Sequence, residues 1–335
     1  MSEQPYSPGR PIGPRVAGHF HTVLPALRHR IVPQRSPEWE PWSCTYDDPD
    51  SGHISLSGAL SDGSTDSDRL LILVHGLGGS IESHYMAPAA RAAVDLGLAC
   101  LRLNLRGADR QPTDLYHAGL TLDLHQALHS SELAGFRRIY VMGFSLGGHV
   151  TLKFGIEEKD ERVGAVAAVC SPLDLRATVR DFDALPRYPY REYIVGGVKN
   201  KVLHILAHRD DLPGELDAAQ IRGVNKLRDF DAATVVPRFG FDDTDHYYES
   251  QSVVHRLHEL RRPALLLAAK EDPMISARSV RSGLASGSGN LEVVWSERGG
   301  HVAFPNDLDL RHRLGLGDQA PRSLEGQIIA WLLQQ

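Results

Sequence analysis

The sequence predicts an α/β protein in which helices flank a mostly parallel central sheet. Short, continuously apolar runs recur along the chain, and each suits a strand that is buried on both faces of a parallel sheet. The runs are LLILVHG (70–76), LACLRLN (98–104), RIYVMGF (138–144), AVAAVCS (165–171), ALLLAA (264–269) and EVVWS (292–296). The stretches 84–97 and 120–134 lie between such runs and have the apolar spacing of helices. Strands that alternate with helices predict βαβ units.

The segments before the first run are of a different kind. Residues 1–17 are rich in Pro, Gly and Arg and are predicted to form an irregular N-terminal arm. Two alternating stretches, near 40–46 and 52–59, predict a leading hairpin that turns at Gly52. The polar segment 61–68 predicts a loop before the first core strand.

The alternation of strands and helices breaks over residues 174–260, which lack strong strand runs. We interpret this interval as a helical cap inserted between two core strands, so that 18–173 and 261–335 form the core. The alternative is a set of ordinary connecting helices, which the length of the interval disfavours. A helical stripe inside the interval consists of Ile194, Val198, Val202 and Ile205.

The composition limits the classes of partner that the chain is expected to bind. Hydrophobic residues make up 42% and charged residues 23% of the 335 residues, as in an ordinary globular protein. The formal net charge of -6 favours neither a nucleic-acid backbone nor an anionic membrane as the main partner. No segment approaches the roughly 20 apolar residues of a membrane span, so stable membrane insertion is not expected.

The cysteines and the N-terminus bear on location. Cys44, Cys100 and Cys170 are too few and too scattered for a disulfide framework, which fits a reducing compartment. None belongs to a CxxC pair, so no zinc site is predicted. The N-terminal residues lack the apolar run of a secretory signal. We therefore expect a cytoplasmic protein.

Chemistry is indicated first by the motif GFSLG (143–147), which follows an apolar run and precedes the plausible helix HVTLKFG. A serine hydroxyl is a weak nucleophile at neutral pH and needs exposure and a nearby base. A sharp strand-to-helix turn, the nucleophile elbow, supplies the exposure. Glycines two positions before and after the serine remove side chains that would collide in that turn. The pattern predicts Ser145 as a nucleophile, with a purely structural glycine turn as the alternative.

A second glycine-rich loop, HGLGGS (75–80), comes directly after the first strong strand. Enzymes with such a serine turn place one oxyanion donor in a loop of this type. The backbone N–H groups of Leu77 and Leu146 are the predicted donors of this oxyanion hole. The alternative is a glycine turn without a catalytic role, and we interpret His75 as a structural histidine.

The base is expected after the last strand, because the chain order in this kind of enzyme is serine, acid, histidine. His301 follows EVVWS in the glycine-rich loop RGGHV and is the predicted base. His255, His258 and His312 lie in helical or charged surroundings, and we interpret them as cap or surface residues.

The acid is expected after the preceding strand, ALLLAA, where Glu271 and Asp272 are both eligible. Asp272 is preferred because Pro273 fixes the turn and biases Asp272 toward an extended conformation. Its carboxylate would set the tautomer of the His301 ring and stabilise the imidazolium. The upstream competitors lie in the predicted cap and follow no core strand; they are Asp242, Asp243 and Asp245.

Together these motifs resemble the YheT-like branch of the α/β-hydrolases. The similarity runs from about residue 18 to near the C-terminus. Its motifs are GHFHTVLPAL (18–27), HGLGGS (75–80), NLRGADR (104–110), YHAGLTLDL (116–124), GFSLGGH (143–149), LRDFDAATVVPRFGFDDTDHYY (227–248), AAKEDPM (268–274) and ERGGHVAF (297–304). The chain departs from the family pattern at His21, Ala108-Asp109, His149 and Glu271, none of which belongs to the predicted triad.

The resemblance implies the α/β-hydrolase fold and a triad of Ser145, Asp272 and His301. It also implies a capped carboxylesterase, with acyl transfer to alcohols known among relatives. The Asp-rich and Tyr-rich run 242–248 is expected to fix the cap on the core. Haloalkane dehalogenase and epoxide hydrolase chemistry is disfavoured, because those relatives use an aspartate at the position of Ser145.

The sequence therefore predicts a serine hydrolase that cleaves carboxylic esters through an acyl-enzyme and requires no metal ion or organic cofactor. The expected partner is a small ester or acyl substrate. Apolar and aromatic cap residues favour a small to medium hydrophobic acyl group, unless they only pack the cap on the core. They are Phe182, Leu185, Tyr188, Tyr190 and Tyr193. An acyltransferase acting on an alcohol is the first alternative, and a non-catalytic binding protein of this fold is the second.

Overall fold

A single mixed sheet organises the computed structural model, which describes residues 16–32, 34–64, 67–109, 111, 113–209, 212–284 and 289–335. Its strand order is β1-β2-β4-β3-β5-β6-β7-β8. The strands are β1 (Glu40–Asp48), β2 (Gly52–Ser61), β3 (Arg69–Val74), β4 (Ala99–Asn104), β5 (Arg138–Phe144), β6 (Val163–Val169), β7 (Ala264–Ala269) and β8 (Leu291–Ser296). β2 is antiparallel to both neighbours, and the pairs from β4 to β8 are parallel. The predicted α/β class is confirmed.

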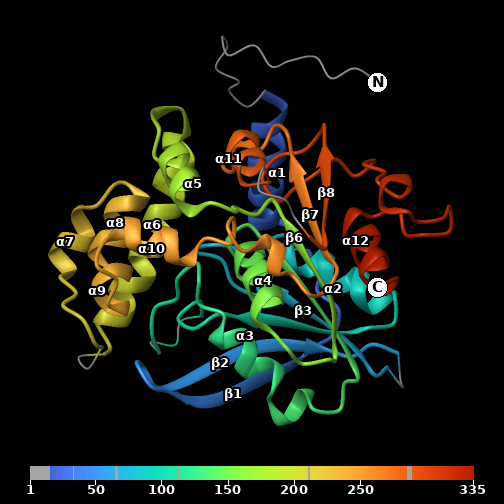
Figure 1. The fold of residues 1–335 in the computed structure, drawn as a ribbon, viewed down its shortest axis with the longest axis horizontal. Helices are drawn as coiled ribbons and strands as arrows, with labels where there is room; N and C mark the ends of the chain where they lie inside the picture. Colours follow the sequence, from blue (N-terminus) through green and yellow to red (C-terminus); the bar gives the residue numbers. More distant parts are fainter. Residues whose placement is uncertain are drawn as a thin grey trace.

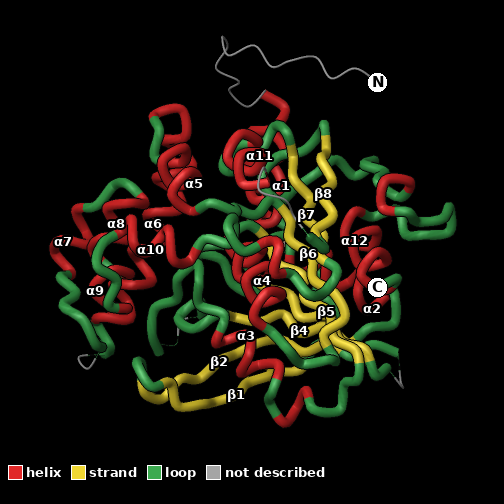
Figure 2. Tube along the Cα trace, in the orientation of Figure 1, coloured by secondary structure: helices red, strands yellow, loops and turns green. Residues whose placement is uncertain are grey.

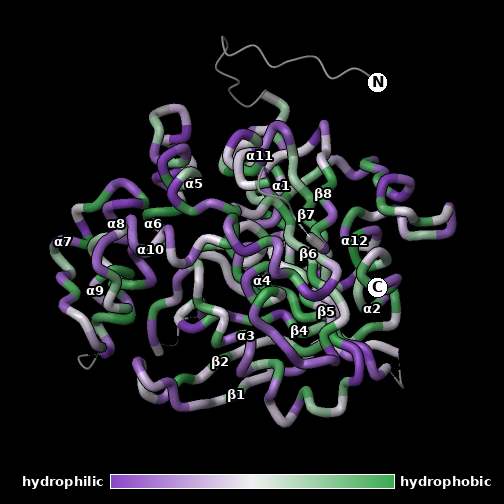
Figure 3. Tube along the Cα trace, in the orientation of Figure 1, coloured by the Kyte–Doolittle hydropathy of each residue, from purple (hydrophilic) through white to green (hydrophobic). Residues whose placement is uncertain are grey.

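Helices cover both faces of this sheet (Figures 1 and 2). Those outside the interval between β6 and β7 are α1 (Val16–Ile31), α2 (Met86–Asp95), α3 (Leu122–Leu128), α4 (Leu146–Glu157), α11 (Ala277–Leu284) and α12 (Leu324–Leu333). Buried apolar side chains join one face of the sheet to α3 and α4, and the opposite face to α2 and α12. Within β3, Ile72 points into the first cluster and Leu73 into the second. Burial on both faces explains why these strands are continuously apolar. Figure 3 shows the hydrophobic residues of the central strands.

The predicted elements map closely onto the observed ones. Every apolar run forms a core strand, and the leading hairpin turns at Gly52, whose φ of +71° is in the left-handed region. Residues 1–15 of the predicted arm lie outside the described residues, while Val16 and Ala17 begin α1. The motif GHFHTVLPAL is therefore helical, which the sequence analysis did not predict.

The interval between β6 and β7 is helical, and its described residues include no strand. Its helices, which we call the cap helices after the predicted cap, are α5 (Leu175–Phe182), α6 (Tyr188–Leu206), α7 (Ala218–Gly223), α8 (Leu227–Ala233), α9 (Val235–Phe239) and α10 (Thr244–Gln251). α6 to α10 gather to one side of the sheet (Figure 1). Val198, Val202 and Ile205 of the predicted stripe are buried against Ile221 and Phe230, so these helices share a small core. Among the described helices, none has the length and apolar character that crossing a bilayer requires.

A buried ionic network joins the hairpin, the core and the cap helices. Arg106, just after β4, donates to Asp123 at 2.8 Å and pairs with Asp48 of the hairpin at 2.9 Å. Asp114 lies 3.5 Å from the same guanidinium. Arg238 of α9 donates to the two oxygens of Asp114 at 2.9 and 2.6 Å. Such buried charges are tolerated only because each is paired.

Replacing Arg106 with methionine, Arg106→Met, leaves buried carboxylates without their cation. We expect the free energy of unfolding to fall by about 3–5 kcal/mol, the usual result of breaking a buried ion pair. Urea denaturation of the full chain measures this loss. The exposed Arg137 offers a matched control, because Arg137→Met should change stability by no more than about 0.5 kcal/mol. Equal stability of the two variants would contradict the role given to the network.

Candidate active site

Ser145 occupies a strained turn between β5 and α4. Its φ of 53° is in a region that non-glycine residues rarely adopt, and its N–H donates to the Val169 carbonyl at 2.8 Å. A Cβ added at Gly143 would lie 2.1 Å from the Gly147 carbonyl oxygen, and one at Gly147 would lie 2.3 Å from the His75 carbonyl oxygen. The two flanking glycines are therefore required by close backbone contacts, and the turn leaves Ser145 partly exposed.

The structure brings Ser145, His301 and Asp272 into one hydrogen-bonded chain. His301 Nε2 lies 2.9 Å from Ser145 Oγ, and His301 Nδ1 lies 2.9 Å from Asp272 Oδ2. A carboxylate only accepts hydrogen bonds, so the ring carries its proton on Nδ1 and leaves Nε2 free to accept from the serine hydroxyl. Residues 145, 272 and 301 follow three different strands of the sheet, and the parallel strands bring these ends to one edge.

Backbone amides fix the carboxylate of Asp272. Its Oδ1 accepts from the N–H groups of Met274 and Ile275 at 2.7 and 2.9 Å, which leaves Oδ2 for His301. Of the two eligible acids, Asp272 is therefore the one that contacts the histidine. The upstream competitors lie elsewhere: Asp243 caps α10, and Asp245 pairs with Arg228.

Helix α1 holds the loop that carries His301. Thr22 Oγ1 accepts from the His301 backbone N–H at 2.8 Å and donates to the Gly18 carbonyl at 2.8 Å. A Cβ added at Gly18 would lie 2.0 Å from the Glu271 carbonyl oxygen, and one at Gly300 would lie 2.3 Å from the Gly18 carbonyl oxygen. The motif GHFHTVLPAL thus places α1 in direct contact with the loops of both the acid and the histidine.

The loop HGLGGS (75–80) is held next to Ser145. A Cβ added at Gly76 would lie 3.1 Å from Ser145 Cβ. The N–H of Gly76 donates to Tyr85 Oη at 2.9 Å, and the N–H of Gly78 donates to Tyr116 Oη at 2.8 Å. Between them, the Leu77 N–H donates to no described residue. A free amide beside the serine is what an oxyanion donor requires.

The second predicted donor, the Leu146 N–H, is the first amide of α4. No residue in the described ranges accepts a hydrogen bond from it. The turn at Ser145 therefore lies at the N-terminal end of a helix, where the helix dipole favours negative charge.

His75 is structural, in agreement with its interpretation from the sequence. The Leu105 N–H donates to its Nε2 at 3.2 Å, so its Nδ1 carries the proton and donates to the Gly76 carbonyl at 2.8 Å. Burial lowers the pKa of this imidazole to about 4. His75 is therefore neutral at physiological pH and holds the loop against the end of β4.

Cys170 is a further neighbour of the acid and the histidine. Its Sγ and ligand atoms of Asp272 and His301 lie within 4.8 Å of one another. Burial, and then the negative charge of Asp272, raise the pKa of the Cys170 thiol well above its usual value. The group is therefore a neutral thiol at physiological pH and not a competing thiolate nucleophile.

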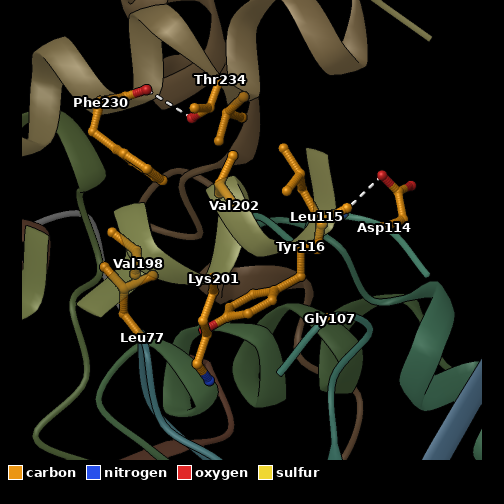
Figure 4. Close-up of a pocket in the computed structure, with 12 residues that line it drawn as sticks. Leu77, Gly107, Asp114, Leu115, Tyr116, Val198, Lys201, Val202, Phe230 and Thr234 are labelled. Carbon is orange, nitrogen blue, oxygen red and sulfur yellow. Dashed lines mark hydrogen bonds between the residues drawn. The ribbon is translucent and has the colours of Figure 1, made fainter. Parts of the chain in front are cut away.

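A largely apolar cavity lies between this loop and the cap helices (Figure 4). It is small, with a volume of about 30 Å³, and its wall includes Leu77, Tyr116, Val198, Val202, Ile205 and Phe230. Leu77 therefore links the cavity to the loop beside Ser145. An apolar cavity with one polar end is typical of a site that binds a hydrophobic chain.

Lys201 joins the cap helices to the loop beside Ser145. This side chain of α6 donates to the carbonyls of Gly79 and Ala108, both at 2.7 Å. Burial lowers the pKa of its ammonium to about 8, so the group is still mainly charged at neutral pH. Lys201 is the one polar contact described between α6 and the glycines of HGLGGS, and it holds that loop from the cap side.

The aromatic residues predicted to favour an apolar acyl group do not line this cavity. Tyr188 and Tyr193 are exposed, and the Tyr190 hydroxyl lies 2.5 Å from His19 Nδ1. They come from the start of α6, whereas the cavity is lined by its second half. Phe182 is buried in α5, and the side chain of Leu185 lies outside the described residues.

Sequence reasoning missed several side chains that hold the site, and only Lys201 left a signal. Lys201 lies on the apolar stripe of α6 between Val198 and Val202, where a charged residue is unusual. Thr22 is the small polar residue of GHFHT, and only the observed packing of α1 shows what it contacts. No sequence pattern distinguishes Tyr85 and Tyr116 from aromatic residues of the core.

The chain resembles known proteins over most of its length. The sequence profile of the alpha/beta hydrolase family matches residues 71–310. "Putative esterase YheT" of Escherichia coli (strain K12) is 26% identical over 309 residues, which cover 90% of this chain and 88% of that protein. "Monoacylglycerol lipase" of Saccharomyces cerevisiae is 27% identical over 256 residues, which cover 73% of this chain and 56% of the lipase. The resemblance to the YheT-like branch is confirmed.

Solved structures agree on the fold. The alpha/beta hydrolase GrgF from Penicillium sp. sh18 superposes with a TM-score of 0.54 and 17% identity over 88% of this chain and 98% of its own. Est1E from Butyrivibrio proteoclasticus gives a TM-score of 0.52 and 15% identity over 88% and 99% of the two chains. The predicted α/β-hydrolase fold is confirmed.

The role of Lys201 is tested by Lys201→Met, which keeps the length of the side chain and removes its donors. The part-buried carbonyls of Gly79 and Ala108 then lose a partner, and the loop beside Ser145 loses its anchor on α6. We expect kcat for a soluble p-nitrophenyl ester to fall by about tenfold or more, with a smaller change in KM. Lys199→Met is the matched control, because Lys199 on the same helix donates only within the cap helices, to Arg222 and Val224. A Lys201→Met enzyme as active as the Lys199→Met enzyme would refute this role.

Proposed function

Because the chain belongs to the alpha/beta hydrolase family, we propose that it is a carboxylesterase in which Ser145, His301 and Asp272 act as nucleophile, base and orienting acid. The observation that carries this proposal is the pair of 2.9 Å contacts that join the three side chains. Relatives named as an esterase and as a monoacylglycerol lipase support an ester as the substrate.

In the proposed mechanism, Nε2 of His301 accepts the proton of the Ser145 hydroxyl while Oγ attacks the ester carbonyl carbon. Asp272 stabilises the imidazolium that forms. Collapse of the tetrahedral intermediate transfers this proton from His301 to the departing alkoxide, which leaves as an alcohol. Ser145 is then acylated, and His301 activates a water molecule that releases the acid and restores the serine.

We assign the stabilisation of the oxyanion in the tetrahedral intermediate to the backbone N–H groups of Leu77 and Leu146, which would donate hydrogen bonds to it. Both amides are free to donate, and the loop of Leu77 is held on both sides by the hydroxyls of Tyr85 and Tyr116. A donor that is held in place before the reaction costs no reorganisation when the charge develops. Loss of one such donor typically costs about 3 kcal/mol of transition-state stabilisation.

We assign the acyl group of the substrate to the apolar cavity beside Leu77, with residues 174–260 acting as the cap that closes it. An acyl carbon seated on Ser145 would direct its chain toward Leu77. From Leu77 the cavity wall continues to Val198 and Val202 (Figure 4). The small volume of the cavity disfavours a long acyl chain.

The serine assignment is tested by kinetics on a p-nitrophenyl ester. Ser145→Ala removes the attacking oxygen, and we expect kcat to fall by about 10⁴-fold or more. Ser171→Ala is a matched control, because Ser171 is a buried serine that follows the neighbouring strand β6. Among the described residues, its hydroxyl bonds only to the Pro172 carbonyl. Full turnover by the Ser145→Ala enzyme would defeat the proposal. Product analysis in the presence of ethanol measures how much acyl group is transferred to the alcohol instead of to water.

The acyl assignment is tested by narrowing the cavity with Val202→Phe. We expect kcat/KM for hexanoyl esters to fall by about tenfold while that for acetyl esters changes little, because only the longer chain reaches Val202. Val195→Phe is the control, since Val195 is a buried valine of the same helix that does not line the cavity. An equal loss for both chain lengths would place the acyl group elsewhere.

A further inference from the structure

Helix α1 presents its apolar face to solvent. Six of the nine large apolar side chains that are exposed in the described ranges lie on α1 or directly after it. On the helix they are Phe20, Val23, Leu24, Leu27 and Ile31, with exposed fractions of 65%, 50%, 59%, 50% and 76%. At 3.6 residues per turn these five positions fall within about 100° of arc. An apolar stripe of this width on a surface helix normally faces the core, and here it faces outward.

The opposite face of α1 makes the contacts with the rest of the protein, and these contacts are polar or close-packed. Gly18 lies against the Glu271 carbonyl, and Thr22 binds the backbone of His301. Two turns further on, His29 Nε2 lies 3.1 Å from the Glu82 carbonyl. The helix is therefore fixed in this orientation, and the outward direction of its apolar face follows from its polar contacts.

The charge of α1 is opposite in sign to that of the whole chain. The helix VAGHFHTVLPALRHRI contains no acidic residue, whereas the complete sequence has a net charge of -6. Arg28 and Arg30 occupy the helical positions on the two sides of the apolar arc. A narrow apolar stripe bordered by arginines is the pattern of a helix that lies in the interface of an anionic lipid bilayer.

We propose that α1 docks this protein on the surface of an anionic lipid bilayer, with Phe20, Leu24 and Leu27 entering the boundary between headgroups and acyl chains. The negative net charge made an anionic membrane an unfavourable partner for the chain as a whole. The charge that meets the lipid, however, is the local charge of α1, because screening limits electrostatic attraction to about 8 Å at physiological ionic strength.

Two other occupants fit the face less well. Residues 1–15 are MSEQPYSPGRPIGPR, a stretch with four prolines whose large apolar side chains are Met1, Tyr6 and Ile12. They offer little apolar area for five exposed side chains. A second copy of the chain, joined through α1 about a two-fold axis, would bring arginines to a helix without acidic partners.

Docking through α1 would hold the site close to the lipid. The inner face of the same helix binds the His301 loop through Thr22, and His19 lies 2.5 Å from the hydroxyl of Tyr190 on the cap helix α6. One short helix thus connects the lipid-facing side chains, the cap helices and the proposed base. This arrangement suits an ester that is drawn from a lipid phase.

The test is co-sedimentation of the full chain with vesicles of equimolar phosphatidylcholine and phosphatidylglycerol. It uses the Ser145→Ala protein, so that the result does not depend on ester hydrolysis. We expect binding to the mixed vesicles, weaker binding to vesicles of phosphatidylcholine alone, and loss of binding at high salt. Leu24→Ser with Leu27→Ser should weaken binding by about tenfold or more, and Arg28→Gln by about fivefold.

A matched control at the same positions is Leu24→Met with Leu27→Met, which keeps the face apolar and should bind like the parent. Circular dichroism confirms that each variant is folded. Three results would overturn the proposal: no binding of the parent to mixed vesicles, equal binding by the serine variant, or a parent dimer that the serine variant dissociates without any vesicle binding.

Discussion

The two hydrogen bonds that run from Asp272 through His301 to Ser145 are the constraint on which the rest of the architecture bears. They join side chains 156 and 29 residues apart in the sequence. Each side chain must therefore be held to within a few tenths of an ångström by its own loop. The parallel strands deliver the three loops to one edge of the sheet, and local contacts do the rest. Asp272 is fixed by two backbone amides, Ser145 by a strained turn, and His301 by Thr22 of α1.

The loop beside Ser145 is also held in place by several hydrogen bonds. Tyr85, Tyr116 and Lys201 bind its backbone from three directions, and the Leu77 N–H between them is left free. These contacts come from the start of α2, from the core and from α6. The cap helices are themselves fixed to the core by the buried pairing of Arg238 with Asp114. A shift of α6 relative to the core would therefore displace the loop that holds the proposed oxyanion donor.

The sheet and the triad candidates were predictable because both leave strong local signals. Continuous apolar runs mark strands buried on both faces, and GFSLG shows the two glycines that the turn around Ser145 requires. The contacts of Thr22 and Lys201 were not predictable, because they depend on how α1 and α6 pack on distant loops. That residues 188, 190 and 193 lie outside the cavity wall was not predictable either, since composition does not tell which turn of a helix faces a cavity. The outward orientation of the apolar face of α1 was not predictable, because an amphipathic pattern does not tell whether the apolar face points to the core or to solvent.

The central claim is that the Ser145 oxygen forms a covalent bond with the substrate acyl group through activation by His301. Intact-mass and peptide mass spectrometry after treatment with a fluorophosphonate measures this directly. The account predicts one adduct per chain, on the peptide that contains Ser145, in the wild-type protein, and none in the Ser145→Ala protein. An adduct on another residue, or ester hydrolysis by a wild-type protein that is never labelled at Ser145, would contradict it.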